Sequence, residues 1–163
     1  MFLKSPPIVD RPIRFALVGC GRISQKHLEA LRQHQSDAEL DAVCDSDPQR
    51  LRSTVEATGA RGFRLLTEML EKTGVDIVAL ATPSGLHPAQ TMLAAKAGRH
   101  VMTEKPMATR WQDGLAMVDA CDRAGVHLFV VKQNRRNATM QLLTMVRASG
   151  AARTLGTGCT SPA

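Results

Sequence analysis

Short apolar runs alternate with amphipathic segments along most of the 163-residue chain. Runs that end at turn residues predict buried strands, and apolar residues spaced three or four positions apart predict helices. The predicted strands cover approximately residues 13–18, 40–45, 62–65, 75–81, 100–103 and 126–132. The predicted helices cover approximately residues 24–35, 48–58, 67–72, 88–97, 109–124 and 140–147. This alternation predicts an α/β domain with a doubly wound parallel sheet over residues 1–148.

Several helix ends and faces can be predicted in more detail. Asp47 is a typical N-cap for the second helix, and Gly59 stands where a left-handed C-cap residue belongs. Thr109 and Gln112 fit a capping box at the start of the fifth helix. The apolar residues predicted to face inward from that helix are Trp111, Leu115, Val118 and Cys121. His27 lies on the apolar face of the first helix, where we interpret it as a packed, hydrogen-bonded histidine rather than a ligand.

The first predicted strand ends in a glycine turn, and a helix follows at once. Such a turn leaves backbone N–H groups free at the positive end of the helix dipole, which suits a pyrophosphate. Gly19 permits the turn, and Gly21 lets a phosphate approach the backbone without a Cβ in the way. Ser24 replaces the third glycine of the usual fingerprint and is still small. The turn residues expected to bind a dinucleotide are Gly19, Cys20, Gly21, Arg22 and Ile23.

A carboxylate closes the second predicted strand. Asp45 follows Gly21 at close to the spacing of about 20 residues at which an acidic residue accepts hydrogen bonds from the adenosine ribose hydroxyls. A carboxylate there would also repel the 2′-phosphate of NADP, so the expected cofactor is NAD. The alternative interpretation is a plain turn residue at a strand end, and the glycine turn upstream favours the binding role.

Two further loops follow predicted strands, and ligands of a doubly wound sheet lie beyond the carboxyl ends of its strands. Residues 82–88 follow the fourth strand, and the triplet at residues 104–106 follows the fifth. These loops, the glycine turn and Asp45 therefore face one crevice, which predicts a dinucleotide-binding Rossmann domain. His87 is either a ligand contact or an N-cap side chain. The expected cofactor contacts in the first of these loops are Thr82, Pro83, Ser84 and His87.

Composition argues against several other functions. The net charge is +6, but Lys and Arg are scattered, so we interpret the charge as a solvated surface rather than a nucleic-acid-binding face. An aromatic content of 3% with no Tyr disfavours stacking on single strands. Neither a signal-peptide pattern nor an apolar membrane span is recognisable, and we expect a cytoplasmic protein. The four cysteines lie far apart, so no metal site is expected, and Cys20, Cys44 and Cys121 read as reduced core residues.

With these motifs in place, the chain resembles the glucose–fructose oxidoreductase/inositol dehydrogenase family, often written Gfo/Idh/MocA. The resemblance covers roughly residues 12–147, and its most specific mark is the Glu-Lys-Pro triplet after the fifth strand. Residues 105–111 and 131–137 are similar to the branch that oxidises a nucleotide-linked N-acetylglucosaminuronic acid at C3 for bacterial surface polysaccharides. The residues that carry the family resemblance are Gly19-Cys20-Gly21-Arg22-Ile23-Ser24, Ala81-Thr82-Pro83, Leu86-His87 and Glu104-Lys105-Pro106.

The resemblance implies an enzyme that uses NAD(H) to oxidise a hydroxyl of a sugar or sugar nucleotide. It places Lys105 beside the nicotinamide and the reacting hydroxyl, as the catalytic residue. An ammonium group there can hydrogen-bond the substrate oxygen and stabilise the charge that develops as the proton leaves and hydride moves. It also implies that Glu104, Lys105 and Gln133 contact the cofactor, and that Asn134 lines the nicotinamide side. Arg135 and Arg136 either meet a carboxylate or diphosphate of the substrate or form a surface patch.

The end of the sequence departs from the family's pattern. Family members are longer and carry a second domain with a mostly antiparallel sheet, a histidine assigned to acid–base work and the oligomer interface. No histidine follows His127, and residues 149–163 are small and polar without periodicity. We therefore expect the second domain to be missing, through a truncated or out-of-frame gene, and the chain to be the cofactor-binding half of an enzyme whose full-length relatives are homo-oligomers. The alternative is a non-catalytic NAD-binding module.

Overall fold

The computed structural model describes residue 8 and residues 10–132, and all the elements below lie in that part of the chain. The described strands are β1 (Ile13–Val18), β2 (Ala38–Cys44), β3 (Arg61–Phe63), β4 (Ile77–Leu80), β5 (His100–Thr103) and β6 (Leu128–Val130). The described helices are α1 (Ser24–Gln33), α2 (Pro48–Thr58), α3 (Leu66–Lys72), α4 (His87–Lys96) and α5 (Trp111–Arg123). Strand and helix alternate as predicted, and the element ends differ from the prediction by a few residues. The helix predicted at 140–147 lies outside the described residues.

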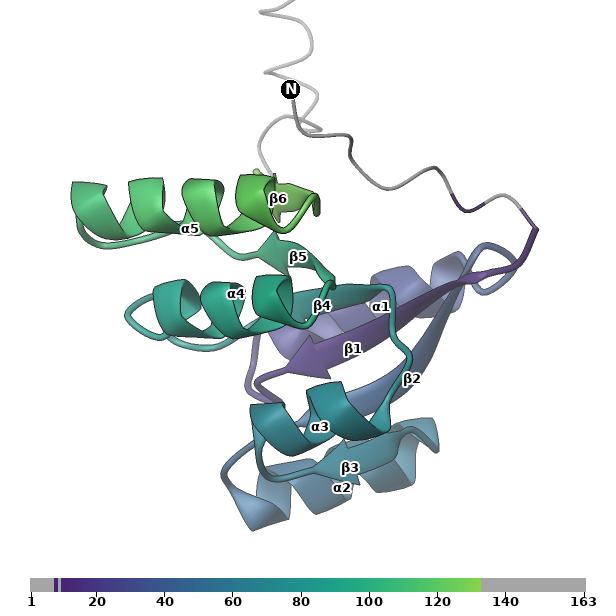
Figure 1. Cartoon of the computed structure of the whole chain (residues 1–163). Coiled ribbons are helices and arrows are strands. Elements are labelled where there is room, and N and C mark those ends of the chain that lie inside the picture. The colour runs from purple at the N-terminus through teal and green to yellow at the C-terminus, as the bar shows by residue number, and fades with distance from the viewer. Residues whose placement is uncertain (1–7, 9, 133–163) are drawn as a thin grey trace, which may run out of the picture. The chain divides into compact units, whose positions relative to one another are not determined.

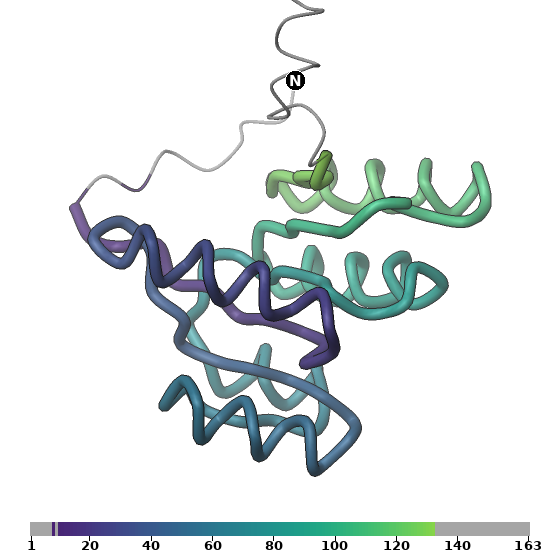
Figure 2. The backbone as a smooth tube through the Cα atoms, turned by 180° about the vertical axis from the view of Figure 1, so that it is seen from behind, coloured from purple at the N-terminus to yellow at the C-terminus, as the bar shows by residue number. Residues whose placement is uncertain are grey.

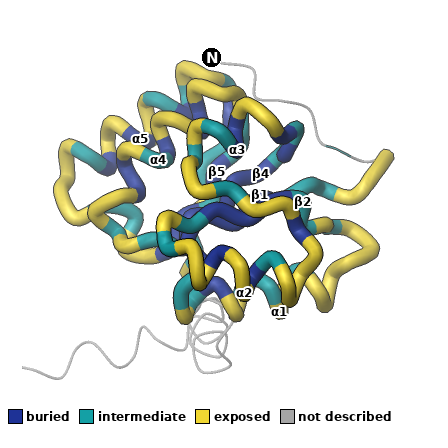
Figure 3. The backbone as a smooth tube through the Cα atoms, turned by 90° about the horizontal axis from the view of Figure 1, so that it is seen from below, coloured by how far each residue is buried: buried dark blue, intermediate teal, exposed yellow. Residues whose placement is uncertain are grey.

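All these strands form one parallel sheet in the order β3-β2-β1-β4-β5-β6. Helices α1 and α2 cover one face of the sheet, and α3, α4 and α5 cover the other (Figures 1, 2 and 3). The chain moves outward from β1 to one edge and then from β4 to the opposite edge. The strand order therefore reverses between β1 and β4, which confirms the doubly wound fold and places a crevice at the carboxyl ends of these two central strands.

Each face of the sheet has its own apolar core. On one face, Val78 and Leu80 of β4 pack with Met69 of α3. On the other face, Leu17 of β1 packs with Leu51 of α2. All four residues of β4 are buried, because a central parallel strand has helices on both sides. Burying one such side chain stabilises the fold by about 1.5–3 kcal/mol, so the central strands are the most firmly held part of the sheet.

The predicted ends of α2 are confirmed. The Asp47 carboxylate accepts hydrogen bonds from the backbone N–H groups of Arg50 (3.1 Å) and Gln49 (2.9 Å), and these bonds lower the pKa of Asp47. Gly59 ends the helix with φ of 72°. The capping box predicted for α5 is wrong, because the N-cap residue is Arg110 and its side chain makes no capping hydrogen bond.

The buried face predicted for α5 is also wrong. Trp111, Leu115 and Val118 are 77%, 51% and 43% exposed, and only Cys121 of the predicted set is buried. The helix instead buries the stripe Gly114, Met117 and Cys121. The ideal Cβ of a residue at Gly114 would lie 3.2 Å from the Cε atom of Met107 in the loop before the helix. A side chain at Gly114 would thus crowd the loop before the helix. The buried stripe of α5 includes Cys121, which packs in one core with Ala94 and Ala95 of α4.

Three predicted core thiols are confirmed. Cys20, Cys44 and Cys121 are buried and form no disulfide, whereas Cys159 lies outside the described residues. Burial raises the pKa of Cys44 to about 12 and also raises the pKa of Cys20. These groups are therefore neutral packing residues. Among the described helices, none has the length and apolar character that crossing a membrane requires.

Candidate functional site

Hydrogen bonds beyond the strands hold the carboxyl ends of β1, β2, β4 and β5 together. They run from Gly19 N to Cys44 O (2.8 Å), from Ala81 N to Val18 O (2.8 Å) and from Glu104 N to Leu80 O (3.2 Å). Each of these residues stands at the point where a strand passes into a loop. The loops that were predicted to share one crevice are therefore fixed side by side.

The glycine turn has the geometry that a dinucleotide needs. Gly19 has φ of +93°, and a Cβ there would lie 2.9 Å from the backbone of Ala81 and Thr82, so only glycine fits without strain. Beside Gly21, in contrast, no atom lies within 4 Å of the place a Cβ would take. The hydroxyl of buried Ser24 donates to the Gly21 carbonyl and takes the place of a third glycine. The open space at Gly21 fits a phosphate group that approaches the backbone.

Asp45 is built into this turn. Its Oδ2 atom accepts the backbone N–H of Cys20 (2.7 Å), and its Oδ1 atom accepts that of Asp47 (2.8 Å). The carboxylate is thus both a turn-forming group and part of the cavity wall. Each carboxylate oxygen has a second lone pair, so the geometry leaves Asp45 able to accept a hydrogen bond from a ligand hydroxyl as well.

A cavity of about 590 Å³ opens between these loops. Of the predicted cofactor contacts, those that line it are Gly19, Gly21, Asp45, Thr82 and Pro83. Sequence reasoning missed Arg50, Arg64 and Gln90, which line the same cavity. Arg64 directly follows β3, so the rule that ligands lie beyond strand ends could have indicated it. Gln90 accepts a hydrogen bond from the Thr82 hydroxyl (2.6 Å). This contact joins a loop to the next helix, and no sequence pattern predicts it.

Of the two interpretations of His87, the N-cap side chain is wrong. It is the first residue of α4, the N-cap is Leu86, and the imidazole is 1% exposed. Its Nε2 atom donates to the carbonyl of Thr82 (2.9 Å), while Nδ1 lies 2.9 Å from the Thr103 hydroxyl and 3.2 Å from the Pro106 carbonyl. The ring therefore connects the loop after β4 to the loop after β5 and positions both loops, and its role as a cofactor contact remains a proposal.

The Glu-Lys-Pro triplet extends the site past β5. Glu104 is buried, and its Oε1 atom lies 2.9 Å from Nε2 of His27 on α1, which confirms His27 as a packed, hydrogen-bonded residue. Lys105 is exposed, and the Lys105–Pro106 peptide bond is cis. The structure thus holds Glu104 firmly against α1 and presents the Lys105 side chain to solvent next to it.

Other predicted site residues lie apart from the cavity lining. Cys20 takes part through its backbone N–H, Arg22 is exposed, and Ile23 packs on the core beneath α1. Ser84 is half-buried in the loop after β4. The predicted contacts that lie outside the described residues are Gln133, Asn134, Arg135 and Arg136.

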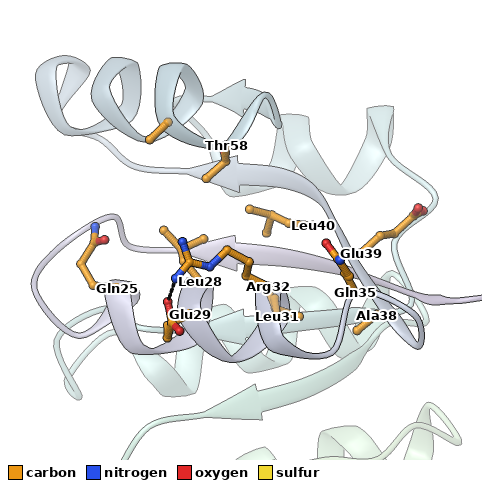
Figure 4. A pocket seen from close by; sticks show the side chains of 11 residues that line it. Gln25, Leu28, Glu29, Leu31, Arg32, Gln35, Ala38, Glu39, Leu40 and Thr58 are labelled. Atoms are coloured by element: carbon orange, nitrogen blue, oxygen red, sulfur yellow. Dashed lines mark hydrogen bonds and ion pairs between the residues drawn. The ribbon is translucent and has the colours of Figure 1, made fainter.

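A second cavity, of about 520 Å³, lies between α1, α2 and β2 (Figure 4). Leu28 and Leu40 form part of its floor, and Glu29 and Arg32 at its rim are paired with each other. None of the predicted cofactor contacts lines it, and it lies beside the strands rather than beyond their carboxyl ends. We therefore assign the functional site to the cavity at the strand ends.

Comparison with known proteins agrees with this geometry. Residues 13–132 match the model of the Gfo/Idh/MocA family, described as an oxidoreductase family with an NAD-binding Rossmann fold. The chain belongs to this family. Among its curated members, a D-apiose dehydrogenase of Paraburkholderia graminis is 39% identical over 137 residues, which is 83% of this chain and 36% of that protein.

Two solved structures of Gfo/Idh/MocA proteins are more similar. The WlbA dehydrogenase of Chromobacterium violaceum, solved with NADH and UDP-GlcNAcA, is 63% identical with a TM-score of 0.87, over 89% of this chain and 42% of that one. The WlbA dehydrogenase of Bordetella pertussis, solved with the same two ligands, is 59% identical with a TM-score of 0.87, over 88% and 42%. The chain thus spans less than half the length of these relatives, and the part it matches is the NAD-binding domain.

Proposed function

We propose that this domain binds NAD across the carboxyl ends of β1, β2, β4 and β5, in an oxidoreductase that acts on a sugar-nucleotide hydroxyl. The observation that carries the proposal is the cavity in which Gly21 leaves open space beside a buried turn and Asp45 forms the wall. The finer proposal, oxidation at C3 of UDP-linked N-acetylglucosaminuronic acid, draws its support from the two WlbA structures, which hold NADH and UDP-GlcNAcA.

Each part of the site has a proposed role. Backbone N–H groups at the start of α1 bind the pyrophosphate, and Asp45 accepts hydrogen bonds from the adenosine ribose. Thr82 and Pro83 form the opposite wall. Glu104, held by His27, borders the nicotinamide end. Gln133, Asn134, Arg135 and Arg136 remain proposed contacts on the substrate side.

Lys105 has the chemistry that oxidation of a hydroxyl needs. NAD, when bound, accepts the hydride that leaves the carbinol carbon. The Lys105 side chain donates a hydrogen bond to the substrate oxygen and stabilises the negative charge that develops there as the hydroxyl proton passes to water. His87 and the cavity-side loops hold the Lys105 backbone in place, since His87 contacts the carbonyl of the next residue, Pro106.

Cofactor binding is tested by titrating the chain with NADH and with NADPH and following NADH fluorescence. We expect saturable NADH binding, weak NADPH binding and a loss of about 10- to 100-fold in NADH affinity on Asp45→Ala, because hydrogen bonds to a charged group contribute about 1.5–3 kcal/mol. Asp119→Ala, on the exposed side of α5, is the matched control and keeps the affinity of the unaltered chain. An Asp45→Ala variant that is folded and binds NADH normally would contradict the proposed site.

Catalysis is tested by supplying NAD and UDP-GlcNAcA and measuring the appearance of NADH. If the chain turns over, Lys105→Met should lower kcat by about 100-fold or more, because one positioned acid–base group contributes about 10²–10⁴. Lys96→Met, at the far end of α4, is the control. Equal turnover by both variants would remove Lys105 from its proposed role.

The alternative function is a module that binds NAD without turnover. NADH binding without any NADH production from UDP-GlcNAcA would favour this module over the enzyme. The division into a cofactor domain at 1–148 and a tail at 149–163 remains a proposal, since residues 133–163 lie outside the described part of the chain.

A further inference from the structure

Two arginines share a cavity lining with the carboxylate that we expect to select the cofactor. Arg50 comes from the first turn of α2, and Arg64 directly follows β3, so the two arginines come from different elements. Both line the cavity at the strand ends, together with Asp45 and Ser46. The cavity lining therefore carries one carboxylate and two guanidinium groups.

The contacts that the structure shows between these arginines and other protein groups are long. Arg64 Nη2 donates to the Ser46 carbonyl at 3.4 Å, close to the limit of a hydrogen bond. Arg50 Nε lies 3.5 Å from Asp47 Oδ2, and its side chain is 61% exposed. An exposed ion pair at this distance contributes little, so the Arg50 guanidinium can turn toward a ligand at low cost. A guanidinium has five N–H donors, and each of the contacts above engages one nitrogen atom of its arginine.

Asp45 and these arginines suit different groups at the ribose 2′ position of the cofactor. An ionised carboxylate only accepts hydrogen bonds, so it pairs with the 2′-hydroxyl of NAD and repels the 2′-phosphate of NADP. A guanidinium only donates, and its planar fork matches phosphate oxygens. The cavity lining thus holds both the group that excludes a 2′-phosphate and the groups that would bind one.

We propose that Arg50 and Arg64 form a latent 2′-phosphate site and that Asp45 alone keeps it closed to NADP. This inference rests on the proposed binding of NAD in the same cavity. It makes Arg50 and Arg64 specificity-determining residues, and it states that the preference for NAD depends on one side chain rather than on the shape of the whole pocket.

The test removes Asp45 while keeping the glycine turn. In Asp45→Ser, the hydroxyl can still accept the N–H of Cys20, and thermal unfolding checks that the variant is folded. We expect the ratio of NADPH to NADH affinity to rise by about 100-fold, since two or more charge-assisted hydrogen bonds replace a repulsion. Adding Arg50→Gln and Arg64→Gln to this variant should abolish the gain. Adding Arg52→Gln, an exposed residue of α2 outside the cavity lining, should not.

The outcomes separate this inference from the proposed function. A folded Asp45→Ser variant without the gain, or with a gain that survives loss of both arginines, would overturn the inference while NADH binding stands. If Asp45→Ser does not fold, Asp45→Asn takes its place, because its amide oxygen can still accept the N–H of Cys20 while the charge is removed. In Asp45→Asn, adding Arg50→Gln and Arg64→Gln should weaken 2′,5′-ADP several-fold more than 5′-ADP in competition against NADH, and equal weakening would overturn the inference. An unaltered chain that binds no NADH would overturn both proposals.

Discussion

Gly19 and Gly21 stand in one turn, yet the space around them differs. Gly19→Ala should lower the free energy of unfolding by about 1–3 kcal/mol, because φ of +93° is strained for alanine and its Cβ would meet the backbone of Ala81 at 2.9 Å. Gly21→Ala should change stability by less than about 0.5 kcal/mol but weaken NADH binding, because its Cβ enters the space a phosphate needs. Urea unfolding followed by circular dichroism, with NADH titration, measures both. Equal destabilisation of the two variants would contradict this account.

Asp76 ties the segment before β1 to the sheet. The Arg11 guanidinium donates to both Asp76 oxygens (2.7 and 2.8 Å), the Arg14 N–H adds a third bond (2.8 Å), and these contacts lower the pKa of Asp76. A lowered carboxyl pKa stabilises the fold above the ordinary Asp value, 3.8, and this contribution is lost as pH falls through the lowered value.

Asp76→Asn should therefore be less stable than the unaltered chain by about 1–2 kcal/mol at pH 7. The difference should shrink as the pH falls below 3.8, because Asp76 then becomes protonated and neutral like the variant. Urea unfolding across this pH range measures it, with the exposed change Asp119→Asn as the control. A difference that stays constant down to the lowest pH would contradict the electrostatic origin of the stabilisation.

At the scale of the helix, α5 offers a comparison of its two apolar stripes. Met117 is fully buried, whereas Leu115 is 51% exposed two positions earlier. Met117→Ala should lower the free energy of unfolding by about 2–4 kcal/mol through lost burial and a cavity. Leu115→Ala should change it by less than about 0.5 kcal/mol. Urea unfolding measures both changes. A larger loss of unfolding free energy in Leu115→Ala than in Met117→Ala would show that the face predicted from the sequence is the buried one.

The same helix shows what sequence patterns can and cannot predict. Buried parallel strands such as β4 form continuous apolar runs, and the ends of α2 depend on nearby residues, so both could be predicted. The rotation of α5 could not, because the Trp111-Leu115-Val118 stripe and the Gly114-Met117-Cys121 stripe have the same helical spacing. The stripe that is buried packs against α4 in the same core, and this tertiary packing is not visible in the spacing along the helix.

The residues of the site also differ in whether the sequence alone predicts them. Gly19, Gly21 and Asp45 were predictable because short spacings along the chain place them at adjacent strand ends. The partners of His87 and the presence of Arg64 in the cavity depend on loops far apart in sequence, which only the folded sheet brings together. A single sequence therefore predicts the atoms nearest the pyrophosphate better than those that position the loops.

At the scale of the whole described domain, three cysteines report on its two cores. Cys20 belongs to the core under α1 and α2, whereas Cys44 and Cys121 belong to the core under α3, α4 and α5. With the pKa of Cys44 raised to about 12, almost none of that thiol is ionised at pH 8. Maleimide labelling followed by mass spectrometry should modify all three only at the rate of global unfolding. Rapid labelling of Cys44 in the native protein would show that its core opens on its own.

The buried ring of His87 has a dynamic consequence for the crevice. Because the ring touches Thr82, Thr103 and Pro106 at once, the loops after β4 and β5 cannot separate without breaking the same contacts. Their backbone amides should therefore exchange with deuterium in one cooperative event, and His87→Ala should let the two loops exchange at different rates. A ligand that holds either loop would then restrain both, so that ordering one side of the crevice orders the other.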